Sequence, residues 1–186
     1  MVVWLHLINN GCNSINISGY HNYKKLNSYI RKLNSKNIKC RNDGDISILE
    51  RIKKYLIESK KTLLVCYGDE IANIKYSKLL NAHFNSKKIL SVTTMKYKSN
   101  FGIFTKNNKK LIFNEKPYLG NYNIGFMLFD FANIKHIKNN KKLSNYFKKM
   151  CKLNLINEYI HNGNHLTVNT LEDLANAKTL IKKYEF

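Results

Sequence analysis

Apolar positions along the chain follow two alternating patterns, one with the spacing of helices and one with the spacing of strands. Helical spacing predicts helices over residues 1–9, 23–35, 47–59, 76–85, 143–153 and 170–182. Strict alternation or short apolar runs predict strands over residues 14–18, 38–41, 62–67, 89–95, 102–104, 110–113, 122–129, 155–159 and 166–168. Helices that alternate with strands favour an α/β fold with a mixed, mostly parallel sheet flanked by helices.

The run from Thr62 to Tyr67 is apolar almost without interruption, which is typical of a central strand buried on both faces. Gly68 and Asp69 follow it directly. In parallel α/β sheets, ligands lie beyond the carboxyl ends of the strands. We therefore expect Gly68 and Asp69 to stand where chemistry takes place.

Length and composition favour one domain over residues 1–186, because 44% of the residues are hydrophobic and no linker rich in Gly, Pro or Ser divides the chain. No apolar run is long enough to cross a bilayer, and the amino terminus lacks the pattern of a signal peptide. We therefore expect a cytoplasmic protein with no membrane partner. The four cysteines are widely spaced, which favours free thiols over a zinc site.

The formal charge of +20 allows two interpretations. A nucleic-acid surface is one, since basic proteins bind polyanions. Compositional drift is the other, because the excess is mostly lysine and accompanies abundant Asn and Ile, whose codons are also rich in A and T. The lysines are spread along the chain in short runs without an aromatic motif of RNA-binding sheets, so we favour drift and do not expect a nucleic-acid partner.

Three short motifs stand at the ends of predicted strands, in order. Tyr67-Gly68-Asp69 and Asn114-Glu115-Lys116-Pro117 each follow a strand, and Asn123-Ile124-Gly125 opens the next one. Each alone is weak, since a Gly-Asp pair is often only a turn and a glycine in a strand often only relieves crowding. Together and at these separations they resemble the sugar-phosphate nucleotidyltransferases, the family of nucleoside-diphosphate-sugar pyrophosphorylases.

Further segments carry the same resemblance. Residues 79–83 resemble the helix that follows the family's Gly-Asp, and residues 99–103 resemble the start of its hairpin. Residues 161–177 resemble its closing segment, and Gly19-Tyr20-His21 stands as in its second strand-helix unit. The resemblance spans nearly the whole chain and implies a Rossmann-like fold of the nucleotide-diphospho-sugar transferase type.

The resemblance also implies a reaction. In this family a phosphate oxygen of a sugar phosphate attacks the α-phosphorus of a nucleoside triphosphate and releases pyrophosphate, for nucleotide-sugar or surface-polysaccharide synthesis. The protein mainly positions the substrates and screens negative charge. By resemblance, Asp69 and Asn169 are the candidate Mg²⁺ ligands, and Asp69 and Lys116 the candidate catalytic residues. Carboxylate and amide oxygens suit that ion.

The residues expected to bind the substrates come from the same motifs. Lys116 would contact the sugar phosphate as a point charge, and Glu115 would contact the sugar. Gly68, Asn123 and the close backbone at Gly125 would line the same pocket. The sequence does not identify the nucleotide base or the sugar, and a homo-oligomer is compatible with it.

Two departures from the family pattern stand out. Its Gly-rich first loop, whose backbone N–H groups bind the triphosphate, is not found in the sequence, and we expect the fold to be truncated at its amino-terminal side. An incomplete chain, a decaying gene and a second polypeptide that supplies the loop are the open explanations. In the closing segment His165 takes the place of an aromatic residue, and Thr167 and Asn169 take places where the family has an Asp, so we expect weaker Mg²⁺ binding.

Three hypotheses of function follow. The first is a nucleotidyltransferase, either active or inactive in this form. The second is a non-catalytic sugar-phosphate-binding or regulatory module of the same fold that keeps Lys116 and Asn123. The third, which we favour least, is a basic nucleic-acid-binding protein.

Overall fold

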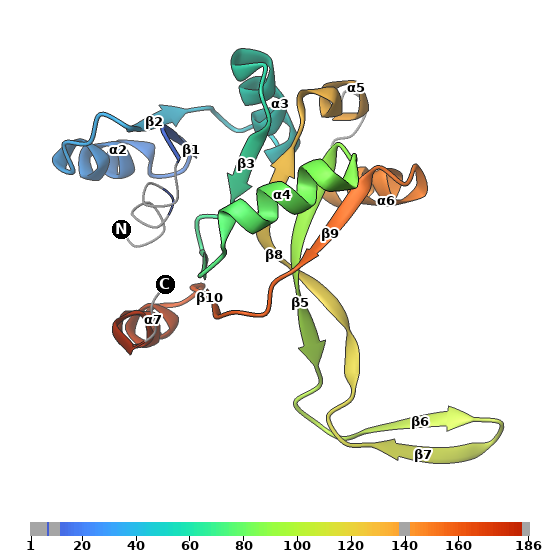
Figure 1. The fold of residues 1–186 in the computed structure, drawn as a ribbon. Helices are drawn as coiled ribbons and strands as arrows, with labels where there is room; N and C mark the ends of the chain where they lie inside the picture. Colours follow the sequence, from blue (N-terminus) through green and yellow to red (C-terminus); the bar gives the residue numbers. More distant parts are fainter. Residues whose placement is uncertain (1–6, 8–11, 138–141, 184–186) are drawn as a thin grey trace.

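The computed structural model describes Leu7, residues 12–137 and residues 142–183. The predicted helix over residues 1–9 therefore lies, apart from Leu7, outside the described residues. The elements (Figure 1) are, in chain order, β1 (Ile15–Gly19), α2 (Tyr23–Lys32), β2 (Ile38–Asn42), α3 (Ile48–Ser59), β3 (Leu63–Cys66), β4 (Glu70–Ala72), α4 (Tyr76–Ser86), β5 (Leu90–Lys98), β6 (Ile103–Asn107), β7 (Lys110–Asn114), β8 (Tyr118–Phe129), η1 (Phe131–Asn133), α5 (Ile134–Ile137), α6 (Leu143–Lys152), β9 (Ile156–Ile160), β10 (His165–Thr167) and α7 (Leu171–Lys183).

The central sheet has four strands in the order β3-β8-β5-β9. β8 pairs antiparallel with both β3 and β5, while β9 pairs parallel with β5. Thus β3, β5 and β9 run in one direction and β8 runs against them. The predicted mixed α/β fold with flanking helices is confirmed, although the central place of β8 makes most of the pairings in this sheet antiparallel.

The two faces of the sheet are covered by different helices. One face packs against α3, α5 and α6 in a cluster that includes Met127 and Phe129. The other packs against α4 in a cluster that includes Phe126 and Leu128. Successive β8 side chains therefore enter opposite clusters, as the two-residue period of a strand requires. All residues of β8 from Ile124 to Phe129 are buried.

β3 corrects one expectation from the sequence. The apolar run there predicted a central strand buried on both faces, yet Leu63–Cys66 is half-buried and forms one end of the four-stranded order. β8 takes a central place instead, and its side chains are buried alternately in the two helix layers. The sequence pattern also missed β4, a three-residue strand that follows the Gly68-Asp69 turn.

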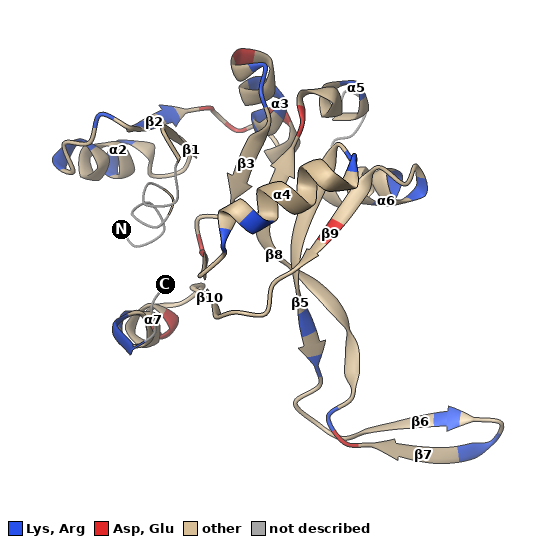
Figure 2. Ribbon diagram, viewed as in Figure 1, with Lys and Arg blue, Asp and Glu red and all other residues tan. Residues whose placement is uncertain are grey.

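Beyond the body of the molecule, β5 and β8 continue as a ribbon that leads to a hairpin of β6 and β7 (Figure 1). The strands predicted over residues 102–104 and 110–113 are the two strands of this hairpin. It projects away from the helices, and lysines lie on both of its strands (Figure 2). We call residues 101–116, which contain this hairpin, the arm.

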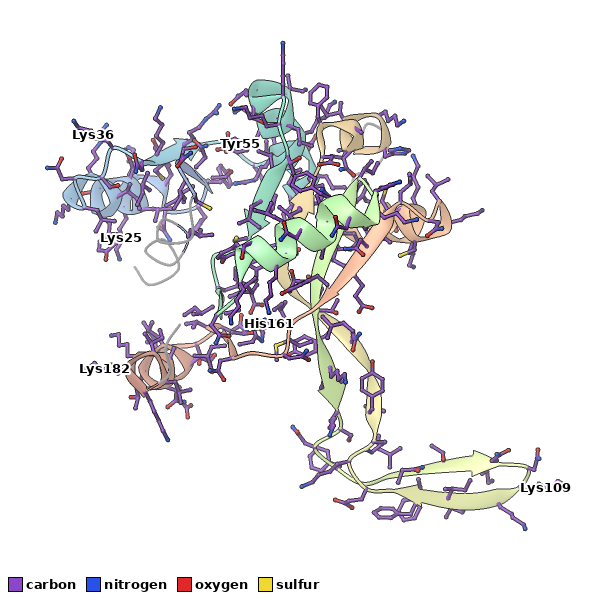
Figure 3. The ribbon with its side chains drawn as sticks, in the orientation of Figure 1. Lys25, Lys36, Tyr55, Lys109, His161 and Lys182 are labelled. Atoms are coloured by element: carbon purple, nitrogen blue, oxygen red, sulfur yellow. The ribbon has the colours of Figure 1, made fainter. Side chains whose placement is uncertain are left out.

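A parallel pair of β1 and β2, covered by α2, lies beside α3. A polar network holds it there. The Asp43 side chain, which is fully buried, accepts hydrogen bonds from Lys54 Nζ at 2.7 Å, Tyr55 Oη at 3.1 Å and Ser18 Oγ. Figure 3 labels Tyr55 on α3, at the junction with this pair. The network stabilises the position of α3 against β1 and β2.

Two helices begin with reciprocal capping. Ser47 accepts from the Glu50 N–H and the Glu50 carboxylate accepts from the Ser47 N–H, which forms a capping box at α3. Thr170 Oγ1 accepts from the Asp173 N–H, and the Asp173 carboxylate accepts from the Thr170 N–H, at α7. Thr170 therefore caps the helix that was predicted over residues 170–182. Across the described residues no helix has the length and apolarity that a membrane span needs.

Candidate functional site

The turn after β3 lies beside the closing segment of the chain. Gly68 and Asp69 are exposed there, and β4 continues from them as an antiparallel partner of β10. The Asp69 carbonyl accepts a hydrogen bond from the Val168 N–H at 2.8 Å, one step beyond the last paired residues, Glu70 and Thr167. Asn169 is the next residue along. The structure thus brings the backbones of Asp69 and Asn169, the two predicted metal ligands, to the same end of one small sheet.

Both predicted ligands have oxygens available for a cation. Within the described residues the Asp69 carboxylate takes part in no hydrogen bond or ion pair, and Asn169 uses its backbone N–H, which donates to Asp173 Oδ2 at 3.0 Å. The same part of the chain holds no group of three or more His, Cys, Asp or Glu side chains that could bind a metal. A cation here would depend on one carboxylate, one amide and the oxygens of its substrates, which is a set that Mg²⁺ accepts.

A bulge in β8 forms the floor next to this turn. The β5–β8 register shifts between the pairs Val92–Met127 and Thr94–Asn123, and Gly125 lies inside the shift with φ +78°. A Cβ at Gly125 would come within 2.8 Å of the Tyr67 ring and 3.0 Å of Glu70 Cγ. Glycine is therefore required twice here, by the left-handed backbone and by the close approach of two side chains.

The bulge places Asn123 at the surface. Its Oδ1 accepts from the N–H of Gly125 at 3.0 Å, while its side chain remains exposed. The Gly125 carbonyl in turn accepts from the Tyr67 N–H at 3.0 Å. Gly68 and Asp69 thus follow β3, and Asn123 and Gly125 belong to its neighbour β8. All four lie beyond the Cys66–Phe126 end of the β3–β8 pairing.

Glu70 organises the inner part of the site, and sequence reasoning missed it. Its Oε2 accepts from Thr167 Oγ1 at 2.8 Å and lies 2.6 Å from His165 Nε2. The Glu70 and His165 side chains are 13% and 7% exposed, so solvent screens this contact weakly. On the other side of the ring, Tyr122 Oη lies 3.3 Å from His165 Nδ1. His165, which takes the place of an aromatic residue in the closing segment, has a largely buried and hydrogen-bonded side chain.

Aromatic rings continue outward from His165 along the β5–β8 ribbon. The Tyr122 ring lies 5.8 Å from the His165 ring, and the Tyr97 ring lies 6.1 Å from Tyr122 in an edge arrangement. Burial, and then the charge of Glu70, raise the pKa of Tyr122. Burial also raises the pKa of Tyr67, and the charges of Asp69 and Glu70 raise it further. Both phenols therefore stay protonated and can donate hydrogen bonds at neutral pH.

The second motif lies elsewhere. Glu115 and Lys116 are exposed between β7 and β8, at the base of the arm (Figure 1). Lys116 adopts φ +44°, which is an uncommon backbone conformation for a lysine. The chain bends tightly at this residue. Six residues, five of them in β8, separate Lys116 from Asn123, and no hydrogen bond or ion pair within the described residues joins Glu115 or Lys116 to Asp69. The predicted site is therefore assembled in part, with the Glu-Lys pair standing apart.

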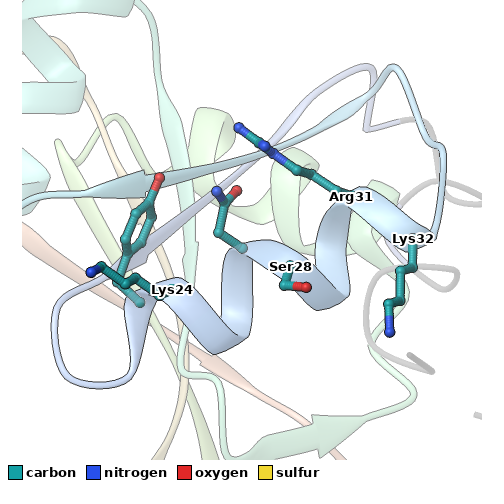
Figure 4. Close-up of a pocket in the computed structure, with 6 residues that line it drawn as sticks. Lys24, Ser28, Arg31 and Lys32 are labelled. Carbon is teal, nitrogen blue, oxygen red and sulfur yellow. The ribbon is translucent and has the colours of Figure 1, made fainter.

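A shallow cavity of about 510 Å³ lies along α2 (Figure 4). Its lining contains three cationic side chains, Lys24, Arg31 and Lys32, and no carboxylate. None of the predicted site residues lines it. All of its lining comes from one helix, so it is a basic face of α2 and forms no part of the site at Asp69.

Comparisons with known proteins show what this geometry is similar to. Neither a protein-family model nor a curated protein matches the chain. Solved structures do: one is a protein from Bacillus anthracis assigned as a glucose-1-phosphate thymidylyltransferase, in complex with a sucrose, at 17% identity and a TM-score of 0.73, covering 97% of this chain and 81% of that one. Another is HddC from Yersinia pseudotuberculosis, alone and complexed with GMP-PN, at 14% identity and a TM-score of 0.70, covering 97% of this chain and 84% of that one. These similarities show that the chain has this fold.

Proposed function

We propose that the protein acts on a sugar phosphate and a nucleoside triphosphate, joining them with release of pyrophosphate. The observation that supports this most is the β4–β10 pairing, which sets Asp69 beside Asn169 at the end of β3 and next to the Gly125 bulge. That arrangement is an open end of a sheet lined with oxygen ligands, where α/β folds bind phosphorylated compounds. The structural neighbours that bind a sugar and GMP-PN support the same class of ligand.

The bonds of the proposed reaction balance simply. An oxygen of the sugar phosphate forms a bond to the α-phosphorus, the bond from that phosphorus to its bridging oxygen breaks, and pyrophosphate carries that oxygen away. Bound Mg²⁺ would screen the negative charge of the phosphates. Asp69 and Asn169 would hold the ion and orient the substrates there, while the Tyr67 and Tyr122 phenols remain hydrogen-bond donors.

A second candidate function is a non-catalytic module that binds a sugar phosphate. The position of Glu115 and Lys116 at the base of the arm favours it, because the two residues expected on the sugar phosphate are not brought to Asp69. A cytoplasmic location stays a prediction under either function.

Pyrophosphate release tests the two candidates. The protein is incubated with Mg²⁺, one of CTP, GTP, UTP or dTTP, and a panel of sugar 1-phosphates, and pyrophosphate is measured. We expect release with wild type and its loss in Asp69→Asn. Asp45→Asn is the matched control, because Asp45 is also exposed but lies before α3. Binding of a sugar 1-phosphate by calorimetry without pyrophosphate release would favour the second candidate, and turnover that survives Asp69→Asn would contradict the metal assignment.

A further inference from the structure

The arm carries aromatic rings that nothing in the described part of the chain covers. Phe101 is 77% exposed, Phe104 63% and Phe113 53%. An isolated two-stranded hairpin is marginally stable in water. Exposed apolar clusters of this kind mark binding surfaces in soluble proteins. The sequence of the arm therefore calls for a partner, and its other side chains limit which partner fits.

The charge of the arm selects an anionic partner. The arm contains four lysines, Lys106, Lys109, Lys110 and Lys116, against the single carboxylate of Glu115. A second copy of this chain would bring another surface of a protein with charge +20 against it. Lysines on the strands of an exposed hairpin also oppose edge-to-edge pairing with a like strand. Charge complementarity thus favours a polyanion over self-association.

The rings are held in place before any partner binds. Phe104 and Phe113 face each other across the β6–β7 ladder, with ring centroids 4.9 Å apart and planes tilted by 50°. The Phe113 ring lies against Gly102, where a Cβ would collide with it. Lys106 lies two residues beyond Phe104 and so on the same face of the strand. One face of the arm therefore presents a fixed aromatic pair next to a cation.

We propose that the arm binds single-stranded nucleic acid, with bases stacked on Phe104 and Phe113 and phosphates bound by Lys106, Lys109 and Lys110. Single strands offer flat bases, which can stack on the exposed rings, and regular negative charge, which can pair with the lysines. A duplex hides the base faces that the rings need. The three lysines lie within residues 106–110, and hairpin pairing places them with the rings on one projecting element (Figure 2). This function is independent of the reaction proposed at Asp69.

The lysine contribution is tested by fluorescence anisotropy of the full chain with labelled 20-nucleotide oligo(U) and oligo(dT), from 50 to 200 mM NaCl. In the triple variant Lys106→Gln, Lys109→Gln, Lys110→Gln we expect affinity to fall on the order of a hundredfold at about 0.1 M salt. The slope of log affinity against log salt should fall by about 2, because each phosphate contact to a single strand contributes about 0.7.

The control removes the same charge elsewhere. Lys25, Lys36 and Lys182 are exposed and lie on the body, away from Lys109 (Figure 3). Their triple change to Gln should reduce affinity by no more than about threefold at these salt concentrations, where distant charges are screened. Equal losses in the two triple variants would overturn the proposal, because binding would then follow net charge alone. Absence of binding by wild type to either oligonucleotide at 50 mM NaCl would also overturn it.

The ring contribution is tested by Phe104→Leu and Phe113→Leu. Leucine keeps an apolar side chain and removes the stacking face, so we expect each change to weaken oligonucleotide binding about tenfold. Affinity unchanged in both variants would contradict stacking.

Equal binding of wild type to phosphatidylglycerol vesicles, unaltered by these changes, would assign the arm to a lipid surface instead. A dimer by light scattering that Phe104→Leu abolishes would assign it to a second copy. Far-ultraviolet circular dichroism and the thermal midpoint of each variant confirm that the body is folded.

Discussion

Asp43→Asn should destabilise the protein through the junction between the β1–β2 pair and α3. The Asp43 side chain is fully buried and accepts hydrogen bonds from Lys54, Tyr55 and Ser18. Asparagine keeps the shape, but it removes the charge that pairs with Lys54 and points an NH₂ group at a donor. Hydrogen bonds to a charged group contribute about 1.5–3 kcal/mol each, and breaking a buried pair costs about 3–5 kcal/mol. Because Lys54 keeps 39% of its side chain exposed, we expect a loss of about 2–4 kcal/mol.

The loss is measured as the free energy of unfolding in urea and as the thermal midpoint. For a domain of this length about 2–4 kcal/mol corresponds to a fall in midpoint of roughly 5–15 °C. Asp45→Asn is the matched control, since Asp45 is an exposed aspartate two residues along, and it should change stability by less than about 0.5 kcal/mol. If Asp43→Asn proves as harmless as Asp45→Asn, the assignment of the network as a structural junction is wrong.

The same variant makes a prediction about pH. Burial opposes ionisation of the Asp43 carboxyl, but hydrogen bonds from Lys54, Ser18 and Tyr55 outweigh it, so its pKa is lowered. A lowered pKa means that the carboxylate stabilises the fold above the pKa of the unfolded chain, and that this stability is lost as pH falls through the folded value. The stability gap between wild type and Asp43→Asn should therefore be full at pH 6 and shrink below about pH 4. A gap that stays constant down to the acid transition would refute the electrostatic part of the reasoning.

Three further predictions concern the site and the thiols. Gly125→Ala should cost about 2–3 kcal/mol of unfolding free energy in urea, since φ is +78° and the new Cβ would press on neighbouring side chains. In a double-mutant cycle of Glu70→Gln and His165→Gln, we expect a coupling of about 1–2 kcal/mol, and additive losses would show that the 2.6 Å contact contributes nothing. Cys151 is exposed, whereas burial raises the pKa of the Cys66 thiol, so iodoacetamide at pH 8 should label Cys151 first by mass spectrometry. Faster labelling of Cys66 would contradict its burial.

Local pattern was enough to predict most elements of this chain. The helical spacing of α3, the strands of the β6–β7 hairpin and the start of α7 all depend on residues within one turn or one hairpin of each other. Elements of that kind are confirmed with small shifts at their ends. β4 was missed because a three-residue strand has too few positions for a period to be visible, and only its pairing with β10 makes it a strand.

The candidate site shows the same division. Gly68, Asp69, Asn123 and Gly125 were predicted from short motifs at the ends of predicted strands, and the fold places them beyond one end of the β3–β8 pairing. Glu70 was missed because its partners lie almost a hundred residues away, as the bond to Thr167 across 97 positions illustrates. No local period reports a contact over that separation.

The sequence by itself determined the order of the longer elements, the mixed α/β class and the residues that end several strands, because these follow from local periodicity and turn chemistry. Only the tertiary structure decided that β8 rather than β3 is the buried central strand, since both runs are apolar and burial depends on neighbours. It also decided that Asp69 meets the closing segment while Glu115 and Lys116 stay at the base of the arm. It set the hairpin within residues 101–116 apart from the helices, so that the Phe104–Phe113 pair, which antiparallel pairing brings together, stays exposed.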